Sequence, residues 1–302
     1  MSSETVDILM ATYNGAKFIK SQLYSLQAQS YQDWRLIVHD DGSTDDTLSI
    51  VRSFAAKDDR INLIEDGITF GNAGGNFLHL LQFSSANYIM FCDQDDIWFE
   101  SKVECHLNVI KEKKTPFAVY SNGYTYNGEV ITSQNFITFH RSNLKDSLFL
   151  NGGIHGCCIM FNRYLLDFAQ NNLPAFIFMH DHFITMLAVT FGKMHYIDKA
   201  LMLYRQHNEN VTGNMQLGFT ERLKTFLDPG NPVLEQRHYN ANQSFYECFK
   251  NQLSDEQRRL FEAYLRFPEV SKLDRLRIIE QNGFVSKNKT QLLFKTLIRK
   301  AI

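Results

Sequence analysis

Residues 88–98 read Tyr-Ile-Met-Phe-Cys-Asp-Gln-Asp-Asp-Ile-Trp, an apolar run that ends abruptly in three carboxylates. The run 88–92 is apolar and partly β-branched, which predicts a buried strand of a parallel sheet. Asp93, Asp95 and Asp96 follow it. Carboxylates this close repel one another and are costly to desolvate unless a divalent cation or a cationic ligand binds there. Because ligands of open α/β sheets bind at the carboxyl ends of strands, this segment predicts an α/β fold with a ligand site at that edge.

The acidic segment also has simpler explanations. A solvated loop that caps the following helix stays open, because Asp is a preferred N-cap residue. A calcium-binding helix–loop–helix is excluded, since it needs a longer alternating loop with Gly and a terminal Glu. A phosphoaspartate phosphatase would carry Thr four places after the first Asp, where this chain has Ile97.

The first hundred residues alternate between two kinds of segment. Strand-like apolar runs occupy residues 6–11, 34–38, 61–64 and 88–92, with helix-like runs between them. This alternation predicts an α/β sheet with right-handed crossovers. Later in the chain we expect helices at 102–113, 144–150 and 180–191, a hairpin over 124–132, and strands at 117–121, 157–161, 195–197 and 201–204. Beyond Asn214 we expect a mainly helical region.

Polar residues end two further strands of this predicted sheet. Thr12-Tyr13-Asn14 ends the first strand and Asp40-Asp41-Gly42 ends the second. A carboxylate there can accept hydrogen bonds from a nucleobase or ribose. Taken alone, the second segment is typical of a turn, and Ser43 or Thr44 is expected to cap the next helix. Because these strand ends and Asp93 face the same edge of the sheet, a shared ligand site is favoured.

The glycine-rich stretch 71–76 opens a further predicted helix. It lacks the Gly-x-Gly-x-x-Gly spacing of a dinucleotide site and the Lys-Ser/Thr of a phosphate loop. A helix N-terminus at this place would nevertheless suit a diphosphate.

Composition limits the classes of function. The chain has 302 residues, enough for one large domain with an appendage. Its net charge is −2, so no nucleic-acid partner is expected. The five cysteines show no metal-binding spacing, which predicts reduced core thiols, no zinc site and a cytoplasmic protein. The N-terminus is unlike a secretory signal and no run is long enough to cross a bilayer, so a soluble or peripheral protein is expected.

Four motifs, in this order, resemble a known family. They are Met10-Ala11-Thr12-Tyr13-Asn14, the stretch 40–47, Gly71-Asn72 and Asp93-Gln94-Asp95-Asp96. Over about residues 5–215 the chain is similar to the family 2 inverting glycosyltransferases. Their GT-A fold has a Rossmann-like, mostly parallel central sheet with flanking helices. The stretch 93–98 and the later Leu203-Tyr204-Arg205-Gln206-His207 look most like the bacterial rhamnosyltransferase branch, which builds surface polysaccharides. The resemblance implies a catalytic domain at 1–214 and a C-terminal helical extension at 215–302.

The resemblance also implies roles for individual residues. Asp181 matches the family's catalytic carboxylate, although the acidic residue that often precedes it is His180 here. Asp95 would hold Mg²⁺ or Mn²⁺ on the diphosphate, and His207 matches a late histidine that can approach the metal. The implied nucleotide-sugar site comprises Thr12, Tyr13, Asn14, Asp41, Asn72, Asp93, Gln94 and Asp95, with Asp41 on the base and Asp93 on the ribose. The implied donor-sugar or acceptor pocket comprises Asp96, Trp98, Gly153, His155 and His180.

The implied reaction is metal-dependent, inverting transfer of a sugar from a nucleotide diphosphate to a hydroxyl of a growing, lipid-linked surface glycan. Rhamnose from dTDP-rhamnose is favoured as the donor sugar over a UDP-hexose. A catalytically silent binding subunit of a glycan-assembly complex is the alternative, against which the intact carboxylates argue. A nucleotidyltransferase would carry a glycine-rich loop with Lys or Arg after the first strand, where Thr12-Tyr13-Asn14-Gly15 stands.

Residues 287–302 carry several cations and no acidic residue. Apolar residues recur there at helical spacing, namely Leu292, Leu293, Leu297 and Ile298. The segment is either an amphipathic helix that lies on an anionic membrane or a packing helix with a solvated basic face. The sequence leaves both open.

Overall fold

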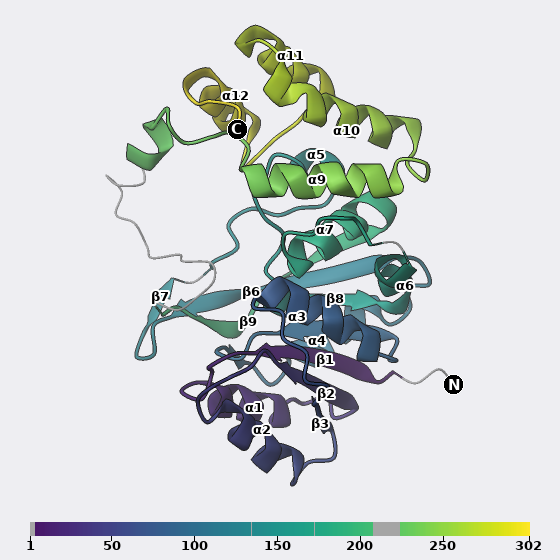
Figure 1. Cartoon of the computed structure of the whole chain (residues 1–302), viewed down its shortest axis with the longest axis vertical. Helices are drawn as coiled ribbons and strands as arrows, with labels where there is room; N and C mark the ends of the chain where they lie inside the picture. The colour runs from purple at the N-terminus through teal and green to yellow at the C-terminus, as the bar shows by residue number, and fades with distance from the viewer. Residues whose placement is uncertain (1–3, 134, 172, 208–223) are drawn as a thin grey trace.

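The structure is a computed structural model that describes residues 4–133, 135–171, 173–207 and 224–302. One mixed sheet forms its centre, and the C-terminal helices stack beyond α7 (Figure 1). The strands are β1 (Val6–Thr12), β2 (Trp34–Asp40), β3 (Ile61–Ile64), β4 (Tyr88–Cys92), β5 (Ile97–Trp98), β6 (Phe117–Tyr126), β7 (Ile131–Ser133), β8 (Ile159–Asn162) and β9 (Lys193–Arg205). The helices are α1 (Ile19–Gln27), α2 (Thr47–Ala55), α3 (Ala73–Leu80), α4 (Lys102–Ile110), α5 (Leu144–Ser147), α6 (Arg163–Asn171), α7 (His180–Phe191), α9 (Gln236–Phe249), α10 (Asp255–Arg266), α11 (Lys272–Asn282) and α12 (Lys289–Ile298).

The strand order in the sheet is β3-β2-β1-β4-β8-β6-β9-β5, and β7 pairs with β6. The neighbours β3, β2, β1 and β4 are parallel, as are β6 and β9, whereas β8 is antiparallel to β4 and β6. Parallel neighbours need crossover connections, which the helices between them supply. This confirms the predicted mostly parallel α/β sheet. Thr12 pairs with Asp40 and Met10 with Cys92, so the polar ends of the three strands lie at one edge.

Some details differ from the sequence predictions. Helix α2 has Asp46 at its N-cap, so neither Ser43 nor Thr44 caps it. Ser43 Oγ instead accepts the N–H of Asn14 from the neighbouring loop. The two short strands predicted at 195–197 and 201–204 form the single strand β9, because shifts of register against β6 let it continue past the polar residues between them. Strand β5 and helix α6 have no counterpart in the predictions.

The C-terminal helices extend the core of the sheet. Phe245, Phe261 and Phe284 are buried in the same continuous apolar cluster as β1 and β4. The ring of Phe149 lies 4.9 Å from the rings of Phe267 and Phe284. These contacts fix α9–α12 beside α5 and α7, as Figure 1 shows. The predicted domain boundary at residue 214 lies outside the described residues.

Helix α12 packs on the protein through one face. Leu292 and Thr296 are buried, and Arg299 just beyond it donates hydrogen bonds to the carbonyls of Thr225 and Phe226. The outer face exposes Leu297. The segment therefore contains a helix that packs on the protein, which is one of the two alternatives that the sequence left open. Within the described residues, no helix combines the length and the apolar character that spanning a membrane requires.

Candidate active site

A cavity of about 890 Å³ lies at the carboxyl ends of β1, β2 and β4. The start of α3, the start of α7 and the end of β9 complete its wall. All the residues predicted for the nucleotide-sugar site line it, namely Thr12, Tyr13, Asn14, Asp41, Asn72, Asp93, Gln94 and Asp95. Asp181, His155, His180 and His207 line it as well. The fold thus brings these separate segments to one place.

The two aspartates at the end of β2 have different surroundings. Asp40 organises the loop, because its carboxylate accepts hydrogen bonds from Thr12 Oγ1 at 2.8 Å and from the N–H of Gly42 at 3.1 Å. Gly42 has a φ of +85°, a conformation that glycine adopts without a steric penalty. Asp41 instead lines the cavity, and one of its oxygens accepts the N–H of Phe70. Asp41 is therefore the carboxylate that can meet a ligand.

The loops after β1 and β4 are joined by one amide side chain. Gln94 accepts the N–H of Tyr13 at 3.0 Å and donates to the Tyr13 carbonyl at 2.8 Å. Gly15 lies so close that an added Cβ would be 2.1 Å from Gln94 Oε1. Gln94 therefore holds the rim of the cavity in shape as well as lining it.

The N-terminus of α3 faces the same cavity. Asn72 caps this helix, since its Oδ1 accepts the N–H of Gly75 at 2.8 Å. Asn72 and Ala73 both line the cavity wall. The positive end of a helix dipole stabilises an anion. The place of this helix N-terminus at the cavity wall therefore agrees with the prediction that it would suit a diphosphate.

The acidic end of β4 is electrostatically strained, as its sequence suggested. Burial, together with the charge of Asp95, raises the pKa of Asp93 to about 7. The same causes raise the pKa of Asp96 well above its usual range. A cation in the cavity would relieve this repulsion.

His207 is held against Asp95 by its neighbours. Its Nε2 lies 2.7 Å from Asp95 Oδ2, and its ring stacks on Phe18 with centroids 4.6 Å apart. The Arg205 guanidinium lies over the same Phe18 ring and donates to the Asp95 carbonyl at 2.7 Å. An imidazole and a carboxylate that meet at a cavity wall are a ligand pair that a divalent cation can use.

Asp181 lies in the first turn of α7, where the helix dipole favours a carboxylate. Its Oδ1 accepts the N–H of His182 at 2.6 Å. Burial nevertheless raises the pKa of Asp181 to about 6, while the N–H donors of His182 and Gly156 and the charge of Arg141 oppose the rise. A carboxylate with this pKa is ionised at neutral pH and still basic enough to accept a proton.

Arg141 is a functional candidate that the sequence did not suggest. Its charge acts on Asp181, and burial lowers the pKa of its own guanidinium to about 10. It donates a hydrogen bond to the Gly152 carbonyl, at the start of the loop that carries His155. Burial and the charge of Arg141 together lower the pKa of His155 to about 4. Arg141 belongs to no motif, so only the fold shows its place.

His180 stands where the resemblance to family 2 glycosyltransferases implies an acidic residue. Its ring lies 4.0 Å from that of Phe77, and burial lowers its pKa to about 3, so it is neutral. An added Cβ on Gly156 would lie 2.5 Å from His180 Nε2, so the loop passes directly over the ring. His180 therefore contributes a flat, uncharged surface to the cavity beside Asp181.

Three predicted pocket residues lie behind the cavity wall rather than on it. Asp96 is fully buried and its Oδ1 accepts the N–H of Arg205 at 3.0 Å. Trp98 is buried with the ammonium of Lys102 4.2 Å from its ring centroid. Gly153 packs on the backbone of α7. Their predicted contact with a sugar stays a prediction, and their observed contacts are with the protein.

Gly153→Ala is expected to lower transfer at least about tenfold with a small effect on nucleotide affinity. An added Cβ would lie 2.6 Å from the Asp181 carbonyl carbon and the His182 nitrogen. Backbone atoms cannot rotate away, so the loop or the first turn of α7 must shift, and misplaced catalytic groups lose rate steeply. Steady-state rates and nucleotide titration check this. Gly230→Ala is the matched control, because its new Cβ would meet only the flexible side chain of Asp228.

Several cavity residues escaped the sequence analysis, including Phe18, Thr69, Asn76, Phe77, Met179 and Tyr204. Four of them are apolar or aromatic, namely Phe18, Phe77, Met179 and Tyr204. Their composition is the same as that of the core, so no local pattern distinguishes them.

Comparison with known proteins agrees with this geometry. Residues 7–168 match the family described as Glycosyl transferase family 2. The chain is 33% identical to the dTDP-rhamnosyl transferase RfbG of Shigella flexneri, over 68% of this chain and 73% of that protein. It is 30% identical to the UDP-Glc:alpha-D-GlcNAc-diphosphoundecaprenol beta-1,3-glucosyltransferase WfgD of Escherichia coli, over 55% of this chain and 64% of that protein. The chain thus spans somewhat less than two thirds of WfgD.

Solved structures share the fold. S. aureus TarS 1-349 in complex with UDP-GlcNAc superposes with a TM-score of 0.59 and 16% identity, over 92% of this chain and 80% of that one. The mannosyltransferase PcManGT from Pyrobaculum calidifontis, in complex with GDP-Man and Mn²⁺, superposes with a TM-score of 0.56 and 15% identity, over 93% of this chain and 76% of that one. These likenesses confirm the predicted GT-A fold, and RfbG confirms the resemblance to rhamnosyltransferases. Because the family match spans more than half of its length, the chain belongs to glycosyl transferase family 2.

Proposed function

We propose that this glycosyltransferase moves a sugar from a nucleoside diphosphate to a hydroxyl of a glycan acceptor, with inversion at the sugar carbon. The observation that carries the proposal is the meeting of Asp41, Asp95 and Asp181 in one cavity. Asp41 would bind the base, and Asp93 the ribose. Asp181 would accept the proton of the acceptor hydroxyl. A single base on the face opposite the leaving group suffices, because no water has to be activated.

We propose Mg²⁺ or Mn²⁺ as the cofactor, held by Asp95 and His207. The fit rests on the pairing of these two side chains at the cavity wall and on the carboxylate repulsion around them. When bound, the ion neutralises charge on the departing diphosphate, which contributes several kcal/mol. The cap of α3 at Asn72 offers the diphosphate a second, neutral contact.

The proposed donor is dTDP-rhamnose, with a UDP-hexose as the alternative. The relative RfbG, named a dTDP-rhamnosyl transferase, supports the first, and WfgD, named a glucosyltransferase that uses UDP-Glc, supports the second. A thermal-shift panel of dTDP, UDP and GDP with Mn²⁺ tests the choice, because a ligand that binds only the native state raises its stability. We expect the largest shift with dTDP. A larger thermal shift with UDP would favour a UDP-hexose as the donor instead.

A catalytically silent subunit remains the competing proposal from another class. It would bind a nucleotide without consuming the sugar donor. The presence of Asp95, Asp181 and His207 in one cavity favours catalysis. Donor consumption measured alongside binding separates the two.

Transfer is expected to depend on pH through Asp181. Burial raises the pKa of Asp181 to about 6, and the base acts only when ionised. The logarithm of kcat/KM should therefore rise with a slope of about 1 below about pH 6 and level off above it. Arg141→Gln should move the break to higher pH, because the guanidinium lowers the pKa of Asp181. A profile without a break in this range, or an unmoved break in the variant, would contradict the assignment.

We propose a lipid-linked acceptor and peripheral contact with the inner face of the cell membrane through the outer face of residues 287–302. Phe294 and Leu297 are exposed there beside Lys287 and Lys300. Cosedimentation should show binding to vesicles that contain anionic lipid and little binding to zwitterionic ones. Leu297→Glu should weaken the binding to anionic vesicles, whereas Val130→Glu, at a similarly exposed position, should not. Equal vesicle binding by the two variants would show that residues 287–302 do not make the proposed membrane contact.

A further inference from the structure

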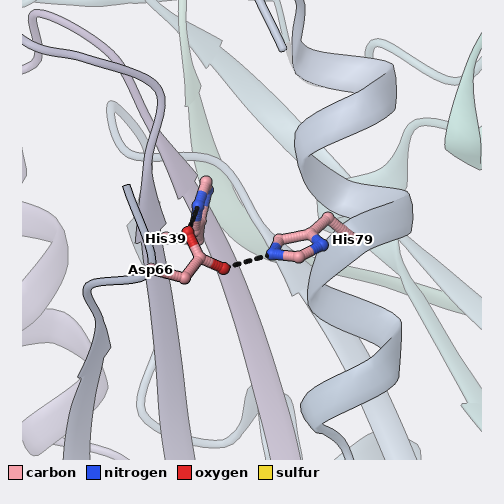
Figure 2. A group of neighbouring side chains, drawn as sticks. All are labelled: His39, Asp66 and His79. Atoms are coloured by element: carbon pink, nitrogen blue, oxygen red, sulfur yellow. Dashed lines mark hydrogen bonds and ion pairs between the residues drawn. The ribbon is translucent and has the colours of Figure 1, made fainter. Parts of the chain in front are cut away.

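A second cluster of metal-binding side chains lies outside the donor cavity. His39 comes from β2, Asp66 from the segment after β3, and His79 from α3. Figure 2 shows the Asp66 carboxylate between the two imidazole rings. His79 Nε2 is 2.7 Å from Asp66 Oδ2, and His39 Nε2 is 3.2 Å from Asp66 Oδ1. One ligand atom from each residue lies within 4.8 Å of the others.

The tautomer of His39 follows from its neighbour Asn76. The Asn76 amide nitrogen donates to the His39 carbonyl at 3.2 Å, so the Asn76 oxygen is the atom that lies 2.8 Å from His39 Nδ1. Nδ1 therefore carries the hydrogen, and a neutral ring presents a lone pair at Nε2. This lone pair faces the Asp66 carboxylate. Two acceptors that face each other repel, and either a proton or a metal ion between them removes the repulsion.

Asp66 is held in position by the backbone of its own segment. Its Oδ1 accepts the N–H of Ile68 at 3.0 Å. The His39 side chain is 2% exposed, and the rings of Phe70 and Phe83 lie 5.0 and 5.1 Å from that of His79. The cluster therefore has an apolar wall, which strengthens the attraction between a cation and its ligands.

We propose that His39 Nε2, Asp66 and His79 Nε2 bind a divalent transition metal, with Zn²⁺ as the matching ion. Zn²⁺ takes imidazole and carboxylate ligands, and three protein ligands leave a fourth position for water. Asn76 supplies the outer hydrogen bond that a metal-binding histidine makes through its other nitrogen. The expectation of no zinc site rested on the cysteines. The histidines here share no motif spacing, and the fold brings them together.

The ion ties the segment 65–72 to the sheet and to α3. Phe70 of this segment donates its N–H to Asp41, and Thr69 and Gly71 line the donor cavity. The metal thus holds a wall of that cavity without touching it. The site is independent of the proposed glycosyl transfer, and its test needs no turnover.

The test is a Zn²⁺ titration of tag-free, chelator-treated protein against a chromophoric chelator. Asp95→Asn is the parent, so that the proposed donor-site metal does not contribute. We expect one site in the parent and a thermal shift with Zn²⁺. His79→Gln should weaken the affinity at least about tenfold and abolish the shift, and so should Asp66→Asn. His195→Gln, at an exposed position on β9, is the matched control and should leave both unchanged.

His79 and Asp66 are chosen because each is partly exposed, so their variants should fold, as circular dichroism would verify. No Zn²⁺ binding by the folded parent at about 100 µM would overturn the proposal. A loss of less than tenfold in both variants, or an equal loss in His195→Gln, would overturn it as well.

Discussion

Asp181→Asn is expected to reduce sugar transfer by about 10²–10⁴-fold, the usual contribution of a general base. The amide keeps the shape of the side chain and an oxygen that can accept the His182 N–H, so α7 should begin as before. Nucleotide affinity should stay within a few-fold, because the proposed role of Asp181 is toward the acceptor. Single-turnover rates together with nucleotide titration check the prediction. Asp59→Asn, at an exposed carboxylate outside the cavity, is the control.

The same variant should be more stable than the parent near pH 8. Burial raises the pKa of Asp181 from 3.8 to about 6, so keeping it ionised costs up to about 3 kcal/mol. Its favourable contribution is fully present below the unfolded pKa and is lost as pH rises through the folded pKa. The gain from Asn should therefore shrink as the pH falls from 8 to about 4. Undiminished transfer would place the base elsewhere, and lost stability at pH 8 would contradict the raised pKa of Asp181.

Asp95→Ala is expected to weaken Mn²⁺-dependent binding of the donor by about 10²-fold or more, since the proposed ion contributes several kcal/mol. The variant removes the carboxylate that lies 2.7 Å from His207 Nε2. Binding measured with excess chelator should change far less, because the proposed base contact at Asp41 remains. Calorimetric titration with and without Mn²⁺ measures both quantities.

The control for this variant is Asp46→Ala, which removes an exposed carboxylate at the N-cap of α2 that makes no side-chain cap hydrogen bond. It should leave both affinities unchanged. If Asp95→Ala weakened binding equally with and without Mn²⁺, the side chain would act on the nucleotide directly rather than through a metal.

The strands in the first half of the sheet were predictable because each is marked by an apolar run within a short segment of sequence. The run at Tyr88–Cys92 is β4 to the residue, and α7 begins at His180 and ends at Phe191 as its apolar pattern indicates. β9 was divided in two because its continuity depends on pairing with β6, which is not local information. The cap of α2 was misplaced because Ser43 is engaged by Asn14 from another loop.

The site was predictable where polar residues end strands. Asp41, Asp93 and Asp95 reach the cavity for that reason. The sequence did not predict two other features, namely Arg141 and the cluster of His39, Asp66 and His79. Their side chains are far apart in the chain and meet their neighbours only in the folded protein. Asp96 follows the same strand end but is buried behind the cavity wall, where its carboxylate accepts the N–H of Arg205. Its predicted contact with a sugar stays a prediction.

The most direct test of the proposed glycosyl transfer is consumption of the sugar donor by the purified, folded chain, with Mn²⁺ and a lipid-linked or oligosaccharide acceptor. Release of the nucleoside diphosphate is followed for dTDP-rhamnose, UDP-glucose, UDP-GlcNAc and GDP-mannose. We expect that one of them, with dTDP-rhamnose first, is consumed by the parent and not by Asp181→Asn. Failure of every one of these nucleotide sugars to bind or to be consumed by folded protein would contradict it.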